Sequence, residues 1–549
     1  MNICMVVCNN LTRDNRVLRE AQTLQAAGHK VFVVGITAGD AEKPAEIMPD
    51  GVKLYRVDWR PTARRRLRIR AIPWGALILL LSGLAIWGSV RLAVQVLARD
   101  PWSKAPELVL ILACALLIVG SFFVLWRAMT ARASAAREAR NVALRKTGAI
   151  SAENGSKSFP PPRSWIPSWV PPALIDALAI PLAILGPRFR QFALSQERAR
   201  QMAALCILLK PDVIHAHDCT ALPIAALVKK ALRIPVVYDA HEIYAEVAAR
   251  RRGVVDYYIL LHRRYLPIVD CFITVNESIA QYYRQVHPEL SPAVVIRNAA
   301  TRMPDCDYDG RLHEAAGLPR SEKILLYQGG FTARRGLPEL VRSASHLPDG
   351  WTLVMMGWGP LEDELREIAS MERSGAGSDG KPQPAARKVI FIPGAPRADV
   401  LLWTAGATVG IIPYEGDILN HWFCTPNKLW EFPSAGVPLI VQPFPELRKV
   451  IEKYGCGWIL PETCTPETLA EMLRGLTDAQ FCAAREGCRK FIEEDSWEAA
   501  YMAPLTQLYD SLKPSDRPVA GIASADASAA ALPIAEKQLS MQNINGVRG

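Results

Sequence analysis

One short predicted helix carries residues that could bind a phosphorylated ligand. The segment reads CTPNKLWEFPSAG, and it predicts a helix that opens with a proline and has Thr425 as its N-cap. The first N–H groups, on Asn427 and Lys428, would face outward with the positive end of the helix dipole behind them. Lys428 and Glu431 lie three residues apart and share a helix face. The segment therefore predicts an anion site, with an ordinary surface salt bridge between the two side chains as the alternative.

A glycine turn offers a second place for phosphate. The run KILLYQGG predicts a strand over 323–330, and FTARRG then leads into a helix that opens with Leu-Pro. Gly329 and Gly330 would let backbone approach a ligand closely, and the helix start offers N–H groups to an anion. Arg335 stands just before that helix and can add a forked contact to phosphate. The alternative is an ordinary strand–helix turn whose arginines are solvated.

Histidines and charged residues follow strands in the first half of the chain. His215 and His217 stand in IHAHD. Because alternating strand residues point to opposite faces, we expect these two imidazoles not to chelate a metal together. His241, in YDAHE, stands at a strand end and is the better candidate for a cleft. Asp14 and Arg16 follow the first strand and are expected to face the same side.

Strands and helices alternate outside the apolar runs, and they would position these residues. A first series predicts strands over 2–9, 29–35, 211–218, 234–242, 271–276 and 293–298, with helices over 14–28, 221–232 and 277–286. A second predicts strands over 323–330, 351–357, 388–394, 407–414 and 438–443, with helices over 337–347 and 360–371. Two such series predict an α/β protein with two Rossmann-like domains that bind ligands beyond the carboxyl ends of their strands. Gly357 ends one such strand and would line a nucleotide base, or else form a plain tight turn.

Two apolar segments interrupt the first series and predict a transmembrane hairpin over 71–127. Residues 71–90 and 108–126 carry no charge, and each is long enough to cross a hydrocarbon core about 30 Å thick. Both outer flanks are rich in arginine, which predicts an inner-membrane, multi-pass protein with two helices and both flanks on the cytoplasmic side. A buried helical hairpin is the alternative. The proline-broken segment 164–189 is expected to lie at the membrane interface, either on its surface or re-entrant.

Composition limits the remaining possibilities. The 549 residues carry a net charge of +10, but the arginines crowd beside the apolar runs, which favours membrane topology over nucleic acid. Twelve cysteines without a C-x-x-C pair are typical of a reducing compartment. The opening residues do not resemble a cleavable signal. The tail over 514–549 has no aromatic residue and is expected to be disordered.

Several of these segments together resemble one enzyme family. The chain is similar to the retaining nucleotide-sugar glycosyltransferases of the GT-B fold, specifically family 4, over about 1–58, 195–300 and 320–510. The resemblance is carried by DNRVLREAQTLQAAGHKVFVVG, by PDVIHAHD followed by VVYDAHE, and by PNKLWEFPSAGVPLIV. It implies that Glu431, as the last glutamate of an E-x7-E motif, binds ribose hydroxyls. It also implies that Arg335 replaces the lysine of a G-R-x-x-x-K-G pyrophosphate turn, and that His241 lies by the transferred sugar.

Two positions depart from the family pattern. Phe331 stands where the arginine of the pyrophosphate turn is expected, and Phe423 stands where the first glutamate of E-x7-E is expected. Glu415 is the nearest upstream glutamate and lies eight positions too early. These departures bear on the identity of the sugar and on the activity itself.

The resemblance and the residues predict a membrane-anchored, metal-independent retaining glycosyltransferase. It would take a sugar from a nucleotide diphosphate to a lipid-linked or membrane-proximal acceptor in polysaccharide or glycolipid synthesis, with no cofactor and no nucleic acid. The expected domains are 1–300 on the acceptor side, 301–495 for the nucleotide sugar and a closing helix over 496–513. Expected site residues are His241 and Glu431 as catalytic, Gly329, Gly330, Arg335, Gly357, Asn427, Lys428 and Glu431 for the donor, and Asp14 and Arg16 for the acceptor. A nucleotide-sugar 2-epimerase and a non-catalytic scaffold in a polysaccharide assembly complex are the alternatives.

Overall fold

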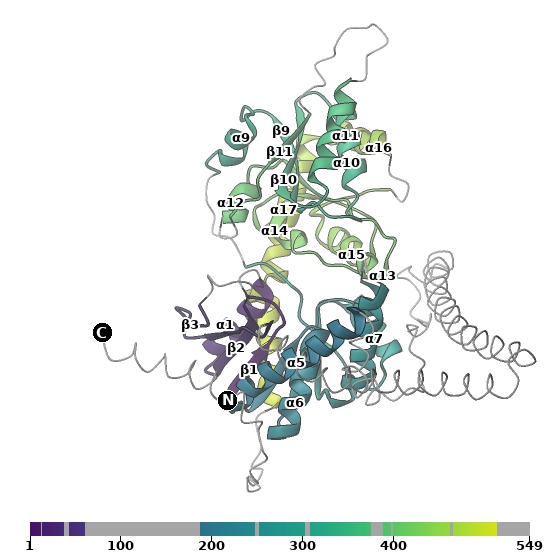
Figure 1. The fold of residues 1–549 in the computed structure, drawn as a ribbon. Helices are drawn as coiled ribbons and strands as arrows, with labels where there is room; N and C mark the ends of the chain where they lie inside the picture. Colours follow the sequence, from purple (N-terminus) through teal and green to yellow (C-terminus); the bar gives the residue numbers. More distant parts are fainter. Residues whose placement is uncertain are drawn as a thin grey trace, which may run out of the picture.

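The computed structural model describes nine stretches of the chain, which form two α/β lobes (Figure 1). They are residues 1–11, 14–37, 43–60, 187–247, 252–301, 308–374, 388–396, 399–461 and 465–512. The predicted hairpin over 71–127, the tail over 514–549 and residues 164–186 of the predicted interfacial segment lie outside these stretches, while helix α5 begins at Pro187. Within the described stretches, no helix combines the length and the apolar character needed to span a bilayer.

The first lobe is built on an eight-stranded sheet of order β3-β4-β2-β1-β5-β6-β7-β8. Every neighbouring pair is parallel except β3–β4. Its strands are β1 (Asn2–Val6), β2 (Lys30–Ile36), β3 (Ala45–Ile47), β4 (Lys53–Val57), β5 (Val213–His217), β6 (Val236–Ala240), β7 (Cys271–Thr274) and β8 (Val294–Val295). Its main helices are α1 (Asn15–Ala26), α5 (Pro187–Leu208), α6 (Leu222–Leu232), α7 (Arg252–Tyr265) and α8 (Glu277–Val286).

The second lobe holds a six-stranded, fully parallel sheet of order β11-β10-β9-β12-β13-β14. Its strands are β9 (Lys323–Gly330), β10 (Trp351–Trp358), β11 (Val389–Ile392), β12 (Val409–Ile412), β13 (Leu439–Val441) and β14 (Gly457–Ile459). Its helices are α9 (Arg311–Ala316), α10 (Leu337–Ser343), α11 (Glu362–Ser374), α12 (Val400–Thr404), α13 (Leu419–Trp422), α14 (Lys428–Ser434), α15 (Pro445–Tyr454), α16 (Pro466–Gly475) and α17 (Asp478–Asp495). The expectation of an α/β protein with parallel sheets is confirmed.

The chain returns to the first lobe after α17. A π-helical turn over Trp497–Tyr501 leads into α18 (Met502–Ser511), which packs against α1. In Figure 1 this yellow segment runs down beside the purple start of the chain. One apolar core therefore runs from β1 and α1 through Trp497 and Tyr509 into the second lobe. Separate cores fill the opposite face of each sheet.

Both sheets have a point where the strand order reverses. In the first sheet, β1 continues to β2 and β4 on one side, and to β5 and β6 on the other. In the second, β9 continues to β10 and β11 on one side, and to β12 and β13 on the other. Loops leave such a switch point in opposite directions and open a crevice at the carboxyl ends of the strands. A ligand site is therefore expected where the two crevices meet.

Candidate active site

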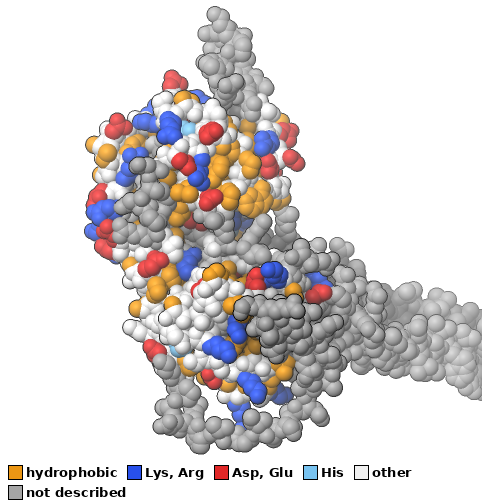
Figure 2. Space-filling view, turned by 90° about the vertical axis from the view of Figure 1, so that its left-hand side faces the viewer, with side chains coloured by type: hydrophobic (Ala, Val, Ile, Leu, Met, Phe, Trp, Pro, Cys, Tyr) orange, Lys and Arg blue, Asp and Glu red, His pale blue; other side chains and the backbone are white. Residues whose placement is uncertain are grey.

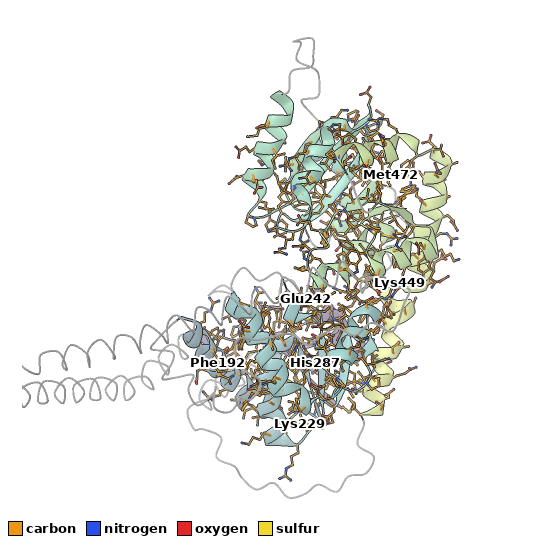
Figure 3. All side chains as sticks on the ribbon, turned by 90° about the vertical axis from the view of Figure 1, so that its right-hand side faces the viewer. Phe192, Lys229, Glu242, His287, Lys449 and Met472 are labelled. Atoms are coloured by element: carbon orange, nitrogen blue, oxygen red, sulfur yellow. The ribbon has the colours of Figure 1, made fainter. Side chains whose placement is uncertain are left out.

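A cavity of about 930 Å³ lies between the lobes and is lined by both. Glu242, from the loop after β6, marks the face of the first lobe that is turned toward the second (Figure 3). Most of the residues expected at the site line this cavity, namely Asp14, Arg16, His241, Gly329, Arg335, Asn427, Lys428 and Glu431. Gly330 and Gly357 are not among the lining residues. The structure thus brings together residues that lie more than 400 positions apart in the sequence.

Two cations of the second lobe meet at one phenol. Arg335 donates from Nη1 to the Tyr414 hydroxyl at 2.6 Å, and Lys428 donates from Nζ to the same oxygen at 3.3 Å. The Arg335 guanidinium also lies 4.9 Å from the centre of the Tyr414 ring. Lys428 is only 7% exposed, and burial lowers the pKa of its ammonium group. Neither cation forms an ion pair with a carboxylate of the described residues, so the pair has uncompensated positive charge for an anion.

Glycines make room for these cations. Gly329, at φ +126°, lies so close to Lys428 that a Cβ there would be 2.8 Å from Nζ. Gly336 is the N-cap of α10 at φ +63°, and a Cβ there would meet the Pro413 carbonyl. Gly357 lets β10 approach the Gly329 carbonyl, since a Cβ there would meet that oxygen. Its place is in the packing of the two strands.

Glu431 is held by the second sheet and not by Lys428. Its Oε2 accepts from Gln328 Nε2 at 2.8 Å, and Gln328 Oε1 accepts from the Thr404 hydroxyl at 2.7 Å. Gln328 is buried, so its amide is fixed and orients the carboxylate toward the cavity. Among the described residues Lys428 and Glu431 form no ion pair with each other. The two side chains thus make separate contacts, Lys428 with Tyr414 and Glu431 with Gln328.

The start of α14 differs from the predicted one. Thr425 does not cap the helix, because Asn427 occupies the N-cap position and its side chain makes no capping bond. The Thr425 hydroxyl instead lies 3.2 Å from Asn276 Nδ2 of the first lobe. Asn427 also reaches across, and its Oδ1 accepts from Asn298 at 2.6 Å. Thr425 was expected to cap its own helix, but its hydroxyl contacts Asn276 of the first lobe. No local sequence pattern could predict that contact.

The residues that depart from the family pattern are buried. Phe331 is fully buried in the core of the second lobe, so the arginine expected there has no counterpart in the cavity. Phe423 packs into a core of the first lobe, and its carbonyl accepts from Asn276 at 2.8 Å. Glu415 is not a substitute acid, since its carboxylate accepts from the Gly336 N–H at 3.3 Å and holds the turn that carries Arg335.

On the first lobe, His241 is ion-paired at both ring nitrogens. Nε2 lies 2.9 Å from Asp239 Oδ2, and Nδ1 lies 3.2 Å from Asp218 Oδ1. Burial would lower the pKa of His241, but Asp218 and Asp239 raise it to about 9. The ring is 19% exposed and lines the cavity. At neutral pH this histidine is therefore a cation.

Asp14 and Arg16 line the cavity, but their side chains form hydrogen bonds with other residues of the first lobe. Asp14 caps α1, accepting from the Val17 N–H at 3.2 Å. Arg16 is 3% exposed and makes two bonds to Asp239, at 2.7 and 2.9 Å. It also donates to the Ile296 carbonyl at 2.6 Å. Burial would raise the pKa of Asp239, but Arg16 and His241 hold it well below its usual range.

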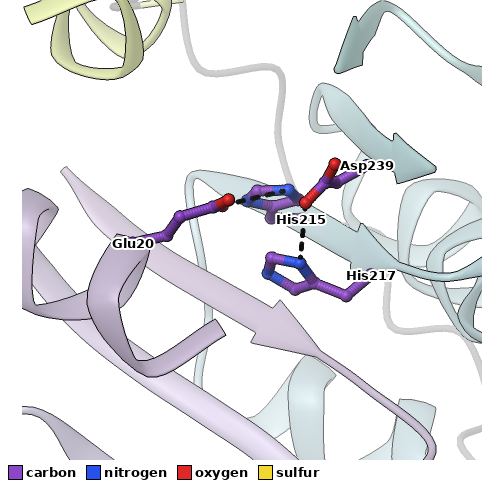
Figure 4. Close-up of side chains that lie close together, drawn as sticks. All are labelled: Glu20, His215, His217 and Asp239. Carbon is purple, nitrogen blue, oxygen red and sulfur yellow. Dashed lines mark hydrogen bonds and ion pairs between the residues drawn. The ribbon is translucent and has the colours of Figure 1, made fainter. Parts of the chain in front are cut away.

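The expectation that His215 and His217 point to opposite faces is wrong. Residues two apart on a strand share a face, and these two rings stack with centroids 4.0 Å apart. With Glu20 and Asp239 they form a fully buried group of four potential metal ligands (Figure 4).

This group fits a metal ion poorly. The two rings are inclined by only 27°, so their in-plane nitrogens do not converge on one point. Arg16 Nε already lies 3.1 Å from Glu20 and 2.7 Å from Asp239 and compensates both carboxylates. Burial raises the pKa of Glu20, and burial together with His217 lowers that of His215. The group is better described as an ion-paired network that supports His241.

Three important residues were not singled out from the sequence. Tyr414 joins the two cations, Gln328 orients Glu431, and Asp218 contacts His241. Each stands near the carboxyl end of a predicted strand, and this position could have marked it as a candidate site residue.

The comparisons with known proteins agree with this architecture. Residues 159–300 match the family model described as Glycosyltransferase Family 4. This part of the chain is therefore similar to glycosyltransferase family 4. No curated protein matches the sequence.

Several solved structures are similar in fold to this chain. Sucrose-phosphate synthase from Thermosynechococcus elongatus is similar at 14% identity and a TM-score of 0.58, covering 93% of this chain and 99% of that one. The UDP-forming alpha,alpha-trehalose-phosphate synthase from Burkholderia vietnamiensis is similar at 11% identity and a TM-score of 0.52, covering 93% of this chain and 100% of that one. A structure described as "Trehalose-6-phosphate from E. coli bound with UDP-2-fluoro glucose" has 11% identity and a TM-score of 0.52, covering 94% and 100%. The two-lobed arrangement of the described residues is thus similar to the fold of these neighbours and agrees with the GT-B fold expected from the sequence.

Proposed function

We propose that this protein is a membrane-anchored retaining glycosyltransferase. It moves a sugar from a nucleotide-diphosphate donor to a lipid-linked or membrane-proximal acceptor, with its lobes on the cytoplasmic side. The family 4-like domain, the GT-B fold and a solved neighbour bound with UDP-2-fluoro glucose support the donor class. The arginine-rich flanks of the apolar segments support the membrane and the acceptor.

The observation that carries the proposal is the pair of cations at Tyr414. Arg335 and Lys428 both contact one neutral phenol oxygen, and neither has a carboxylate partner among the described residues. Two like charges this close repel each other until an anion lies between them. A diphosphate supplies that anion. Glu431, turned toward the same cavity, then accepts bonds from the ribose hydroxyls.

In the proposed reaction, negative charge develops on the leaving diphosphate. Arg335 and Lys428 stabilise that charge in a partly desolvated site, and this stabilisation needs no metal or cofactor. The helix starts that were expected to help contribute less, because α10 and α14 have only seven residues each. His241 lies on the side of the sugar, and retention follows if the acceptor attacks on the face from which the diphosphate leaves.

Donor binding and transfer test the proposal together. Full-length protein in membranes is titrated with nucleoside diphosphates by calorimetry, and assayed with labelled nucleotide sugars and membrane extract. We expect binding and transfer in the native protein, and a loss of transfer of about 100-fold or more in both Arg335→Ala and Glu431→Ala. Arg342→Ala is the matched control, since Arg342 is an exposed arginine of α10 that is paired with Glu339.

The other outcomes separate the alternatives. Interconversion of the donor without any acceptor would indicate an epimerase. Absence of nucleotide binding in the native protein would indicate a scaffold. Full transfer in both variants would refute the assignment of the donor site.

A further inference from the structure

His241 is enclosed by carboxylates in a way that fixes both of its nitrogens. Asp239 faces Nε2 at 2.9 Å, and Asp218 faces Nδ1 at 3.2 Å. The Nε2 contact is a hydrogen bond, and because a carboxylate only accepts, Nε2 must carry a proton. The Nδ1 contact has the distance of an ion pair, and the negative charge of Asp218 beside Nδ1 favours a proton there as well. A general base needs one nitrogen free to take a proton, and both nitrogens of His241 face a carboxylate.

The two aspartates are themselves locked in place. Asp239 is fully buried and receives two bonds from Arg16, which is anchored in turn to the Ile296 carbonyl. Asp218 accepts a short hydrogen bond from the Tyr244 hydroxyl. Its backbone has φ +66°, a strained value for a residue other than glycine, and surrounding contacts must hold it there. Strain of this kind beside a residue that lines the cavity indicates that the position of the carboxylate matters.

We propose that Asp218 and Asp239 are positioning residues that hold His241 as an imidazolium at the cavity wall, so that it serves transfer as a fixed cation and not as a base. This inference rests on the proposed glycosyltransferase function. It places a second cation of the first lobe, besides the ion-paired Arg16, on the wall of the cavity that Arg335 and Lys428 also line.

The proposal fixes where the proton goes during transfer. The bond between the sugar C1 and the diphosphate oxygen breaks, and a bond between C1 and the acceptor oxygen forms. The hydroxyl proton of the acceptor leaves with the nucleoside diphosphate, because His241 is already fully protonated. Atoms and charge balance without a proton transfer to the protein.

The pH dependence follows from the groups that face His241. They are Asp218 and His217 from β5 and its end, Asp239 from β6, Arg16 and Glu20 from α1, and Glu242 and Tyr244 from the loop after β6. The two aspartates outweigh burial and the positive charge of Arg16, and the pKa of His241 is raised to about 9. A raised pKa means that the charge is present below that pH and is lost as the pH rises through it. Activity should therefore have an alkaline limb and no requirement for a neutral histidine.

Two readouts on the full-length chain test this proposal. The first is the titration of ¹⁵N-labelled histidines by NMR, with His241 assigned from the signal missing in His241→Gln. The second is the pH profile of kcat/KM for transfer. In the native protein we expect both ring nitrogens of His241 to be protonated at pH 7.5 and the rate to fall near pH 9.

Removing one charge should move both readouts together. In Asp218→Asn the amide oxygen still accepts a hydrogen bond but carries no charge, so the midpoint and the alkaline limb should each drop by about one pH unit or more. Asp239→Asn should do the same. Should the loss of its bonds to Arg16 prevent folding, Asp218→Asn alone suffices, because that side chain is 30% exposed. The control is Asp270→Asn, whose carboxylate pairs with Lys229 at the far end of the lobe (Figure 3).

The contrary results are distinct. A midpoint for His241 near or below the ordinary value of about 6.5 would overturn the proposal. An alkaline limb that Asp218→Asn leaves unchanged would do so as well. Because the NMR titration does not depend on turnover, a native protein without transferase activity would refute the proposed function and leave the state of His241 measurable.

Discussion

At the scale of single residues, the candidate site depends on one glycine that admits a lysine. Lys428 is buried beside Gly329, Tyr327 and Tyr414, and it reaches the cavity only because residue 329 has no side chain. The lysine contributes a positive charge to the site although it is buried, and this burial lowers the pKa of its ammonium group. This arrangement is stable only while the backbone of residue 329 keeps φ at +126°.

Replacing Gly329 by alanine should therefore impair nucleotide binding more than folding. The new Cβ would lie 2.8 Å from Lys428 Nζ and displace the ammonium group. We expect a loss of affinity for nucleoside diphosphate of about tenfold or more, equivalent to one charge-assisted hydrogen bond, in a calorimetric titration. Gly350→Ala is the control, because Gly350 also has positive φ (+76°) but would have open space around its Cβ. Both variants should lose about 1–2 kcal/mol of stability from backbone strain, and equal affinity in the two would contradict the prediction.

The sequence could identify site residues only where a strand end or a short motif marks them. Strand β9 and helix α8 have the predicted bounds because their apolar periodicity is strong. Gly329, Arg335 and Glu431 could be found because they stand at strand ends or in a recognisable motif. Thr425, Phe423 and Asp218 could not be assigned, since their partners are Asn276, a core of the other lobe and His241. Contacts between distant segments decide such positions.

At the scale of elements, α13 and the residues after it tie the second lobe to the first. Asn420 accepts from the Ile243 N–H at 2.8 Å, while Asn276 bonds to Phe423 and Thr425. Leu419 and Phe423 fill a core of the first lobe. The place where a glutamate was expected is therefore a docking point between the lobes. The surface of the second lobe that Figure 2 shows mixes basic, acidic and apolar side chains, in contrast to this apolar contact.

Introducing the expected glutamate at position 423 should lower the stability of the protein and should not increase its affinity for the donor. Phe423 is 6% exposed, so Phe423→Glu would bury a carboxylate among apolar side chains. We expect a loss of stability on the order of 3 kcal/mol in thermal or denaturant unfolding, with no gain in donor affinity. Phe423→Met keeps the contact apolar and should cost less than about 1.5 kcal/mol. Tighter donor binding in Phe423→Glu would show that the side chain reaches the cavity after all.

At the scale of the whole molecule, the C-terminal segment makes the two lobes one cooperative unit. Trp497 is 2% exposed, and its Nε1 donates to Thr23 on α1 at 2.9 Å. Twelve residues later, the Tyr509 hydroxyl bonds to His215 Nδ1 at 2.7 Å, next to the network that holds His241. The second lobe reaches this segment through α17, since Trp430 of α14 donates to the Asp495 carbonyl at the end of α17 at 2.9 Å, and Trp430 and Trp497 belong to one apolar core. The distance between the cations of the two lobes thus depends on this segment.

A cavity at Trp497 should therefore loosen both lobes, while a similar cavity elsewhere should loosen one. Trp497→Ala is expected to cost about 3–5 kcal/mol, a large part of the 5–15 kcal/mol typical of a domain. Hydrogen exchange should then speed up in α1 as well as in α14 and α17. Trp351→Ala is the matched control, because Trp351 is 5% exposed and packs against Phe481 within the second lobe only. Its exchange should rise around β10 and leave α1 protected. Protection of α1 that survives Trp497→Ala would mean that the first lobe is stable without the C-terminal segment, and that α13 and the other direct contacts between the lobes hold the site together.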